Sequence, residues 1–157
     1  MGQTPTFKYA SLGEAIAIAS VAHSEQTTRD GGPYILHPLF VMQSVAHLCI
    51  HTQVAAVLHD VLEDHPQWSI DVLRRRGFHP KVLKALALLN HDPKVPYEEY
   101  IEGIGEDEIA TNVKMADLDH NSRLTRLKGV SKKDLARTIK YNKAYTYLRG
   151  NKDIYSR

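Results

Sequence analysis

The sequence predicts an all-α protein, a helical bundle, and three features support this fold class. Apolar residues recur at spacings of three and four along most of the chain, as they do on the buried face of a helix. Capping residues, prolines and glycines punctuate these segments and leave only short loops between them. No segment shows the clear alternation of apolar and polar residues that is typical of a half-buried strand.

The first half of the chain predicts three helices and one long loop. Helices are expected where apolar residues keep helical spacing, and the loop where Thr, Asp, Gly and Pro gather. A proline suits the first turn of a helix, so the His-Pro pair favours a helix start. The expected elements are a helix over 12–22, a loop over 25–36, a second helix that begins at His37-Pro38 and runs through Ala46, and a third helix that holds His59 and Asp60.

The second half predicts five further helices, separated by proline and glycine. Ser69 is suited to cap one helix that Gly77 ends, and Ser131 with Asp134 forms a capping-box pattern at the start of the last helix. The expected ranges are 69–77, 80–89, a short helix over 97–101, 106–119 and 131–148.

The composition favours one globular domain over residues 1–157. The chain has 157 residues, 43% of them hydrophobic and 24% charged, which is ordinary for a domain with its own core. Its single cysteine, Cys49, excludes an internal disulfide framework and a cysteine-based zinc cluster, and we expect it to fill space in the core. A net charge of +2 is too weak to indicate nucleic acid as a partner.

The chain also lacks the sequence features of a membrane or secreted protein. No run approaches the roughly 18 to 20 apolar residues of a membrane span. The polar start, Met1 to Thr6, does not resemble a signal peptide. We therefore expect no membrane partner, a cytoplasmic location, and a monomer or homodimer.

The run from His59 to Asp64 is the most unusual local feature. It places a histidine and three carboxylates on two helical turns, with Glu63 and Asp64 one turn beyond His59 and Asp60. Carboxylates gather in this way around a cation, and they also gather on a solvated helix end. The run alone leaves both interpretations open.

Four residues can converge on one metal ion if the helices form a bundle: His37, His59, Asp60 and Asp117. Imidazole with carboxylate suits Mn²⁺, Fe²⁺, Zn²⁺ or Ni²⁺, and four protein ligands leave positions for water or substrate. Taken singly, His37 also fits a helix cap, and Asp117 also fits an exposed acid.

Two helix faces carry groups suited to a phosphorylated substrate. Lys114 and Asn121 share a face with Asp117, and a basic stripe with one aromatic lies on the last helix. Ordinary solvated faces look the same, so both interpretations stay open. The stripe consists of Lys133, Arg137, Lys140 and Tyr141.

From about residue 10 to residue 148 the chain resembles the HD-domain metal-dependent phosphohydrolases. Within that family it is similar to the ppGpp hydrolase domain of the RelA/SpoT proteins and to the small alarmone hydrolases. The ordered motifs carry the resemblance: Ala22-His23 with Gln26, Gly32-Pro33-Tyr34-Ile35-Leu36-His37-Pro38, Leu58-His59-Asp60-Val61-Leu62-Glu63-Asp64, and Val113-Lys114-Met115-Ala116-Asp117 with Asn121.

The resemblance implies a helical HD bundle that hydrolyses the 3′-pyrophosphate of ppGpp with Mn²⁺, in a chain without a synthetase domain. The implied metal ligands are His37, His59, Asp60 and Asp117, with Glu63 and Asp64 placing or deprotonating the attacking water. The implied substrate contacts are Asn121 and Tyr141, and Arg29, Lys114, Lys133 and Arg137 can neutralise the phosphates.

Two departures from the family pattern bear on the substrate. Thr28 stands where the bifunctional enzymes have an arginine that stacks on guanine, with Arg29 next to it. Asp119 adds an acid near the metal ligands, and its place about 200° around the helix from Asp117 also fits a side chain that points away from them. Two alternatives remain. One is a phosphohydrolase for another nucleotide, such as NADPH, a nucleoside monophosphate or another alarmone. The other is a nucleotide sensor without catalysis.

Overall fold

The computed structural model describes residues 8–150 and 155, and within these it contains helices and no strand. An isolated bridge pairs Thr27 with Pro33 in the loop after the first helix. The expected all-α class is therefore confirmed. The helices are α1 (Leu12–Ala22), α2 (Leu36–Ser44), α3 (Ile50–Leu58), α4 (Val61–Asp64), α5 (Ile70–Arg75), α6 (Pro80–Leu89), α7 (Tyr97–Ile104), α8 (Glu108–Asn121) and α9 (Lys132–Leu148), with a 3₁₀ turn at Leu124–Arg126.

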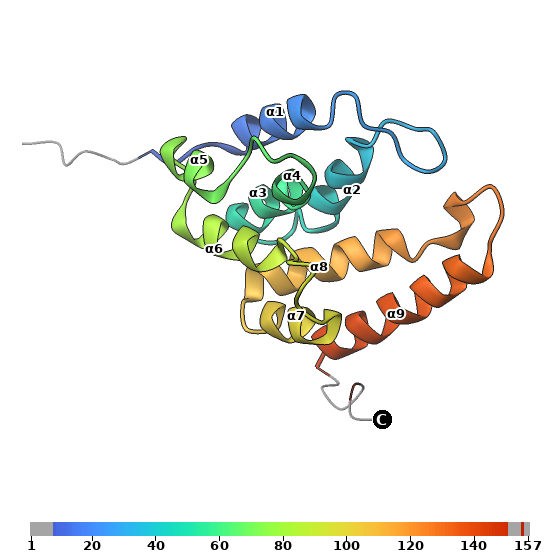
Figure 1. The fold of residues 1–157 in the computed structure, drawn as a ribbon. Coiled ribbons are helices and arrows are strands. Elements are labelled where there is room, and N and C mark those ends of the chain that lie inside the picture. Colours follow the sequence, from blue (N-terminus) through green and yellow to red (C-terminus); the bar gives the residue numbers. More distant parts are fainter. Residues whose placement is uncertain (1–7, 151–154, 156–157) are drawn as a thin grey trace, which may run out of the picture.

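Helix α3 is the centre of the bundle. It packs against α1, α2, α6 and α8, and its residues 54–58 are fully buried or nearly so. Figure 1 shows α8 and α9 as a long antiparallel pair below α3 and α1 above it, while α2 lies beside α3 and packs against both α3 and α8. Such a helix needs apolar side chains all round, and the sequence supplies them in Val54-Ala55-Ala56-Val57-Leu58.

Side-chain caps fix the start of α5, α8 and α9. The Ser69 and Asp107 side chains accept hydrogen bonds from backbone N–H groups in the first turns of α5 and α8. At α9 the expected capping box is present, since Ser131 and Asp134 each bond the other's backbone N–H. The cap expected at Ser69 is likewise confirmed.

The third helix is shorter than the sequence predicts. It ends at Leu58, so His59 and Asp60 lie in the junction between α3 and α4 and not on one continuous helix. The His59 Nδ1 atom lies 2.7 Å from the Ala56 carbonyl oxygen, and this local bond competes with the helical ladder at that point. The break turns Asp60 and His59 toward the same centre.

Three smaller expectations are also corrected. Helix α2 begins at Leu36 and ends at Ser44, before Ala46, while α7 continues to Ile104. Cys49 is not a core residue but the exposed residue just before α3. The segment Met1 to Thr6 lies outside the described residues.

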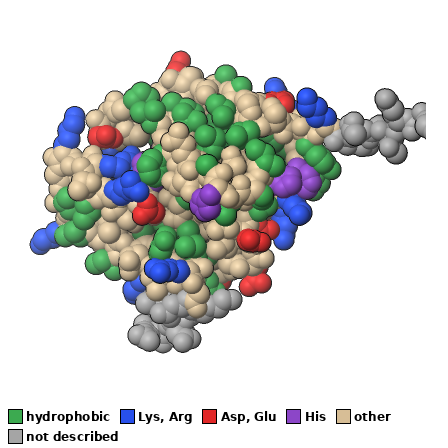
Figure 2. Space-filling view, turned by 180° about the vertical axis from the view of Figure 1, so that it is seen from behind, with side chains coloured by type: hydrophobic (Ala, Val, Ile, Leu, Met, Phe, Trp, Pro, Cys, Tyr) green, Lys and Arg blue, Asp and Glu red, His purple; other side chains and the backbone are tan. Residues whose placement is uncertain are grey.

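The face shown in Figure 2 carries basic, acidic and hydrophobic side chains intermixed, in keeping with the weak net charge. None of the helices described is long and apolar enough to cross a membrane.

Candidate metal centre

Four side chains from three parts of the chain meet inside the bundle. His37 comes from the first turn of α2, His59 and Asp60 from the α3–α4 junction, and Asp117 from α8. The Nε2 atom of His37 lies 3.4 Å from Asp60 Oδ2 and 3.2 Å from Asp117 Oδ1. The Nε2 atom of His59 lies 3.2 Å and 3.6 Å from the same two oxygens. Each of the two nitrogens therefore lies within 3.6 Å of one oxygen of each aspartate, and His37, His59 and Asp60 are close enough together to share one ion.

The donor set and its spacing fit a divalent cation. Two ligand atoms held about 2.1 Å from one ion lie roughly 3.0 Å apart in an octahedral site and roughly 3.4 Å apart in a tetrahedral one. The four nitrogen–oxygen separations, 3.2 to 3.6 Å, fall near this range. In addition, His59 Nε2 is buried without a hydrogen-bond partner, which an ion at the centre would resolve.

The electrostatics of the four groups are those of a mutually stabilised cluster. Burial opposes the charged form of Asp60 and Asp117, but the histidines, and Lys114 beside Asp117, hold the pKa of both carboxyls well below the ordinary value. Burial likewise opposes protonation of His37 and His59, yet the two carboxylates raise the pKa of both rings. Protons and a metal ion therefore compete for the same nitrogens.

Neighbouring groups fix the orientation of the four side chains. The Nδ1 atom of His59 bonds the Ala56 carbonyl, which leaves Nε2 to face the carboxylates. The Tyr34 hydroxyl donates to Asp60 Oδ2 at 2.6 Å. On Asp117, Lys114 Nζ donates to Oδ2 at 2.9 Å and Asn121 Nδ2 donates to Oδ1 at 2.6 Å.

Glu63 and Asp64 follow in α4, one turn beyond Asp60. Burial and then the charge of Asp60 raise the pKa of Glu63, a direction that suits a group that accepts a proton near neutral pH. Asp64 is exposed, and its Oδ2 accepts a hydrogen bond of 2.9 Å from Gln26 Nε2.

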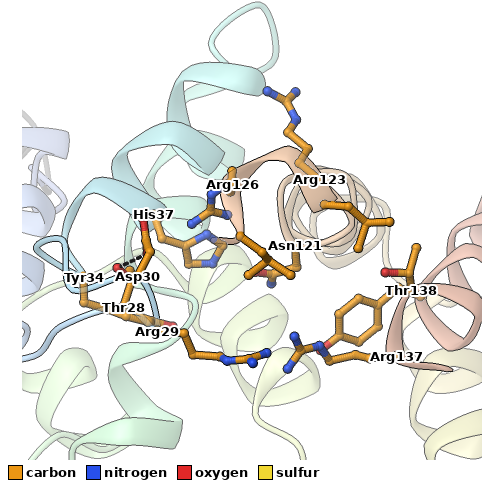
Figure 3. Close-up of a pocket in the computed structure, with 13 residues that line it drawn as sticks. Thr28, Arg29, Asp30, Tyr34, His37, Asn121, Arg123, Arg126, Arg137 and Thr138 are labelled. Atoms are coloured by element: carbon orange, nitrogen blue, oxygen red, sulfur yellow. Dashed lines mark hydrogen bonds between the residues drawn. The ribbon is translucent and has the colours of Figure 1, made fainter. Parts of the chain in front are cut away.

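A cleft rich in arginine opens beside the cluster and shares His37 with it. Figure 3 shows Arg29 and Arg137 directed toward each other from opposite sides, Arg126 beside His37, and Arg123 directed away from them. The walls of the cleft are Thr28, Arg29, Asp30, Tyr34, His37, Asn121, Arg123, Leu124, Arg126, Leu127, Arg137, Thr138 and Tyr141. A cleft with this many guanidinium groups suits a phosphorylated ligand.

Asp134 holds two of these arginines in place. Its Oδ1 accepts hydrogen bonds from Arg29 Nη1 at 2.5 Å and Arg137 Nη2 at 2.8 Å, while its Oδ2 accepts from the Ser131 backbone and hydroxyl. The side chain is 2% exposed. Hydrogen bonds from Ser131, and then from Arg29, hold the pKa of Asp134 well below the ordinary value.

The structure places the expected substrate residues in three groups. Arg29, Asn121, Arg137 and Tyr141 line the cleft. Lys114 lies in the interior against Asp117, outside the cleft wall. Lys133 is exposed one turn nearer the start of α9 than Arg137 and does not belong to the cleft wall.

Two further charged residues near the metal cluster had no role assigned from the sequence. Asp119 is exposed and pairs with Arg123, so it adds no charge to the metal cluster. Arg126 lies next to the metal ligands through His120, to which it donates a hydrogen bond of 3.0 Å. In the sequence, the one indication of a role for Arg126 is that it is a basic residue soon after the Asp117 motif.

The chain is similar in sequence to proteins named as ppGpp hydrolases. No family model matches the chain. The chain is 32% identical over 123 residues, 71% of its length, to the bifunctional (p)ppGpp synthase/hydrolase SpoT of Escherichia coli K12. It is 35% identical over 86 residues, 54% of its length, to a guanosine-3′,5′-bis(diphosphate) 3′-pyrophosphohydrolase of Aquifex aeolicus. The chain spans only 18% and 12% of the length of these two relatives.

The fold agrees with these sequence matches. A solved structure of a metazoan ortholog of SpoT, described as hydrolysing ppGpp, superimposes with a TM-score of 0.74 at 22% identity. The match covers 95% of this chain and 89% of that one. Sequence and fold together mark the chain as a ppGpp hydrolase-like HD-domain protein.

Proposed function

We propose that the chain is a Mn²⁺-dependent hydrolase that removes the 3′-pyrophosphate of ppGpp and gives GDP and pyrophosphate. The observation that carries the proposal is the position of a two-histidine, two-aspartate cluster at one end of an arginine-lined cleft, with His37 common to both. The names of the two relatives given above, a (p)ppGpp synthase/hydrolase and a guanosine-3′,5′-bis(diphosphate) 3′-pyrophosphohydrolase, support the same substrate.

The residues that would hold the ion are His37, His59, Asp60 and Asp117. When bound, such an ion supplies Lewis acidity, which lowers the pKa of water from 15.7 toward about 7 and polarises a phosphoryl oxygen. This donor set also suits other divalent transition metals, so the choice of Mn²⁺ belongs to the proposal.

Side chains of the protein supply the remaining catalytic and binding roles. Glu63, with its raised pKa, accepts the proton of the attacking water, and Asp64, held by Gln26, orients that water. Arg29 and Arg137 neutralise the phosphates in the cleft, and Asn121 and Tyr141 contact the nucleoside. Lys114 compensates the charge of Asp117 from the interior and keeps that carboxylate ionised.

A second candidate substrate follows from Thr28, which lines the cleft where related enzymes carry a stacking arginine. Its hydroxyl donates to Asp30 at 2.5 Å and lies 3.2 Å from the Gly32 carbonyl, so this position offers a small polar contact and no planar surface. Another nucleotide, such as NADPH with its 2′-phosphate, would depend less on a side chain that stacks on its base at this position.

Turnover of ppGpp by variants of the Mn²⁺-loaded protein tests the proposal. Asp60→Ala should abolish hydrolysis because it removes a ligand, and Glu63→Gln should lower kcat about 10²- to 10⁴-fold with metal still bound. His47→Ala, at an exposed histidine outside the cluster, is the control and should keep full activity. Full turnover by Asp60→Ala would overturn the proposal, as would binding of ppGpp by the wild type without any hydrolysis.

A further inference from the structure

A second group of metal-ligating side chains lies beside the metal cluster and shares none of that cluster's four ligands, although its Asp64 also belongs to the proposed catalytic pair. His23 follows the last turn of α1, and His65 directly follows Asp64 at the end of α4. Ligand atoms of His23, Asp64 and His65 all lie within 4.8 Å of one another. Gln26, in the loop after α1, reaches into the same group.

The spacing of the donor atoms in this group is that of a coordination face. His65 Nε2 lies 3.1 Å from His23 Nδ1, His23 Nδ1 lies 2.8 Å from Gln26 Oε1, and His65 Nε2 lies 3.2 Å from Gln26 Oε1. These three edges form a nearly equilateral triangle. Three ligand atoms held about 2.1 Å from one octahedral ion would have edges of roughly 3.0 Å.

The fourth donor is tied to the same face. Gln26 Nε2 donates to Asp64 Oδ2 at 2.9 Å, so the amide that supplies one donor oxygen also fixes the nearby carboxylate. A carboxylate adjacent to two imidazoles supplies the negative charge that a divalent cation requires.

Packing holds the His23 ring in a position from which it can bind a metal ion. His23 is 1% exposed and packs against Tyr34 and His65, with ring centroids 5.0 Å and 4.8 Å away. Its Nε2 has no hydrogen-bond partner, so packing and not a hydrogen bond fixes that side of the ring. Burial is the main cause of the lowered pKa of His23, and a neutral ring keeps a lone pair for a metal.

We propose that His23, His65, Gln26 and Asp64 form a second divalent-cation site, selective for Zn²⁺-like transition metals over Mg²⁺ and Ca²⁺. Two imidazole nitrogens favour a borderline-soft ion, whereas Mg²⁺ and Ca²⁺ prefer a shell of oxygens. Tyr34 separates the two sites, since its ring contacts His23 and its hydroxyl bonds Asp60. The site shares Asp64 with the proposed catalytic pair, but binding of a cation there does not depend on which substrate the protein hydrolyses.

The stoichiometry of Zn²⁺ binding to the EDTA-stripped and dialysed 157-residue chain tests this proposal. After equilibrium dialysis at neutral pH, elemental analysis should find two equivalents per chain in the wild type and one in His65→Ala. The partly exposed position of His65 makes this variant tolerable to the fold, which circular dichroism and the melting temperature should verify. Asp64→Asn, at an exposed position, should weaken the same equivalent at least tenfold.

Two controls separate this site from the first one and from adventitious binding. His47→Ala should retain two equivalents, because His47 is exposed and lies outside both clusters. Replacing Zn²⁺ by Co²⁺ should give visible ligand-field bands of two environments, of which His65→Ala loses one. A single equivalent in the wild type, or two equivalents in both His65→Ala and Asp64→Asn, would overturn the proposal, whatever the protein hydrolyses.

Discussion

His37 Nδ1 lies 2.7 Å from His120 Nδ1, and the two rings stack at 20° with their centroids 4.9 Å apart. Arg126 Nη1 donates to the same nitrogen of His120 at 3.0 Å. An arginine can only donate, so His120 Nδ1 accepts and His37 Nδ1 carries the proton. This leaves His37 Nε2 to face the carboxylates. Burial, followed by the positive charges of His37 and Arg126, lowers the pKa of His120 to about 4 and keeps the ring neutral.

His120→Ala should therefore weaken Mn²⁺ binding about 10- to 100-fold, because His37 loses the partner that fixes its orientation. Isothermal titration of the metal-stripped protein measures the effect directly. The exposed His47→Ala variant is the control and should bind as the wild type does. An unchanged affinity in a folded His120→Ala protein would show that the stacked pair does not support the metal site.

Asp134→Ala should raise the KM for ppGpp with little change in kcat, since it releases Arg29 and Arg137 from their shared carboxylate. Ser131→Ala separates this effect from helix capping. It removes the cap of α9, at a cost of about 1 kcal/mol, but leaves the pairs between Asp134 and the arginines intact. Steady-state kinetics of both variants should show the KM effect in Asp134→Ala alone, and an equal rise in both would contradict the positioning role.

The metal-stripped protein should be most stable between about pH 4 and pH 6.5. Asp60 and Asp117 have depressed pKa values in the folded protein. Their contribution to the free energy of unfolding is therefore present above about pH 4 and is lost as the pH falls through these depressed pKa values. His37 and His59 have raised pKa values in the folded protein. Their contribution to the free energy of unfolding is therefore complete below about pH 6.5 and is lost as the pH rises through these raised pKa values.

Melting curves across pH, with EDTA or with Mn²⁺, check this expectation. Mn²⁺ should raise the melting temperature of the protein more at pH 8 than at pH 5.5, because protons compete less for the histidine nitrogens at pH 8. Equal stabilisation at both pH values would argue against these histidines as the ligands.

The acidic limb of kcat/KM should lie above the ordinary glutamate pKa of about 4.3, because burial and then Asp60 raise the pKa of Glu63. Glu63 is protonated and unable to accept a proton below its shifted value, so activity should fall as the pH decreases through it. Glu63→Gln should remove this limb along with most of the rate. An unchanged profile in the residual activity of Glu63→Gln would assign the limb to another group.

Most of the fold follows from local sequence, while several features of the site depend on tertiary contacts. The apolar period and the Ser131–Asp134 box predict α1, α6 and α9 well. The break at His59 was missed because it depends on a side-chain bond to the Ala56 carbonyl within an unbroken apolar pattern.

The same distinction holds for the site. The ordered motifs identify the four candidate metal ligands, and in the structure their nitrogen and oxygen atoms lie close together. The link between Arg29 and Asp134 joins positions 105 residues apart, which no local pattern reveals. Lys133 shares a face of α9 with Arg137, but the spacing does not tell how far along that face the cleft extends.

Product analysis of ppGpp incubated with the Mn²⁺-loaded protein tests the central claim most directly. Chromatography should show loss of ppGpp with GDP and pyrophosphate formed in equal amounts, and a parallel reaction with NADPH should release less product. Stoichiometric phosphate from NADPH with ppGpp left intact would contradict the assignment.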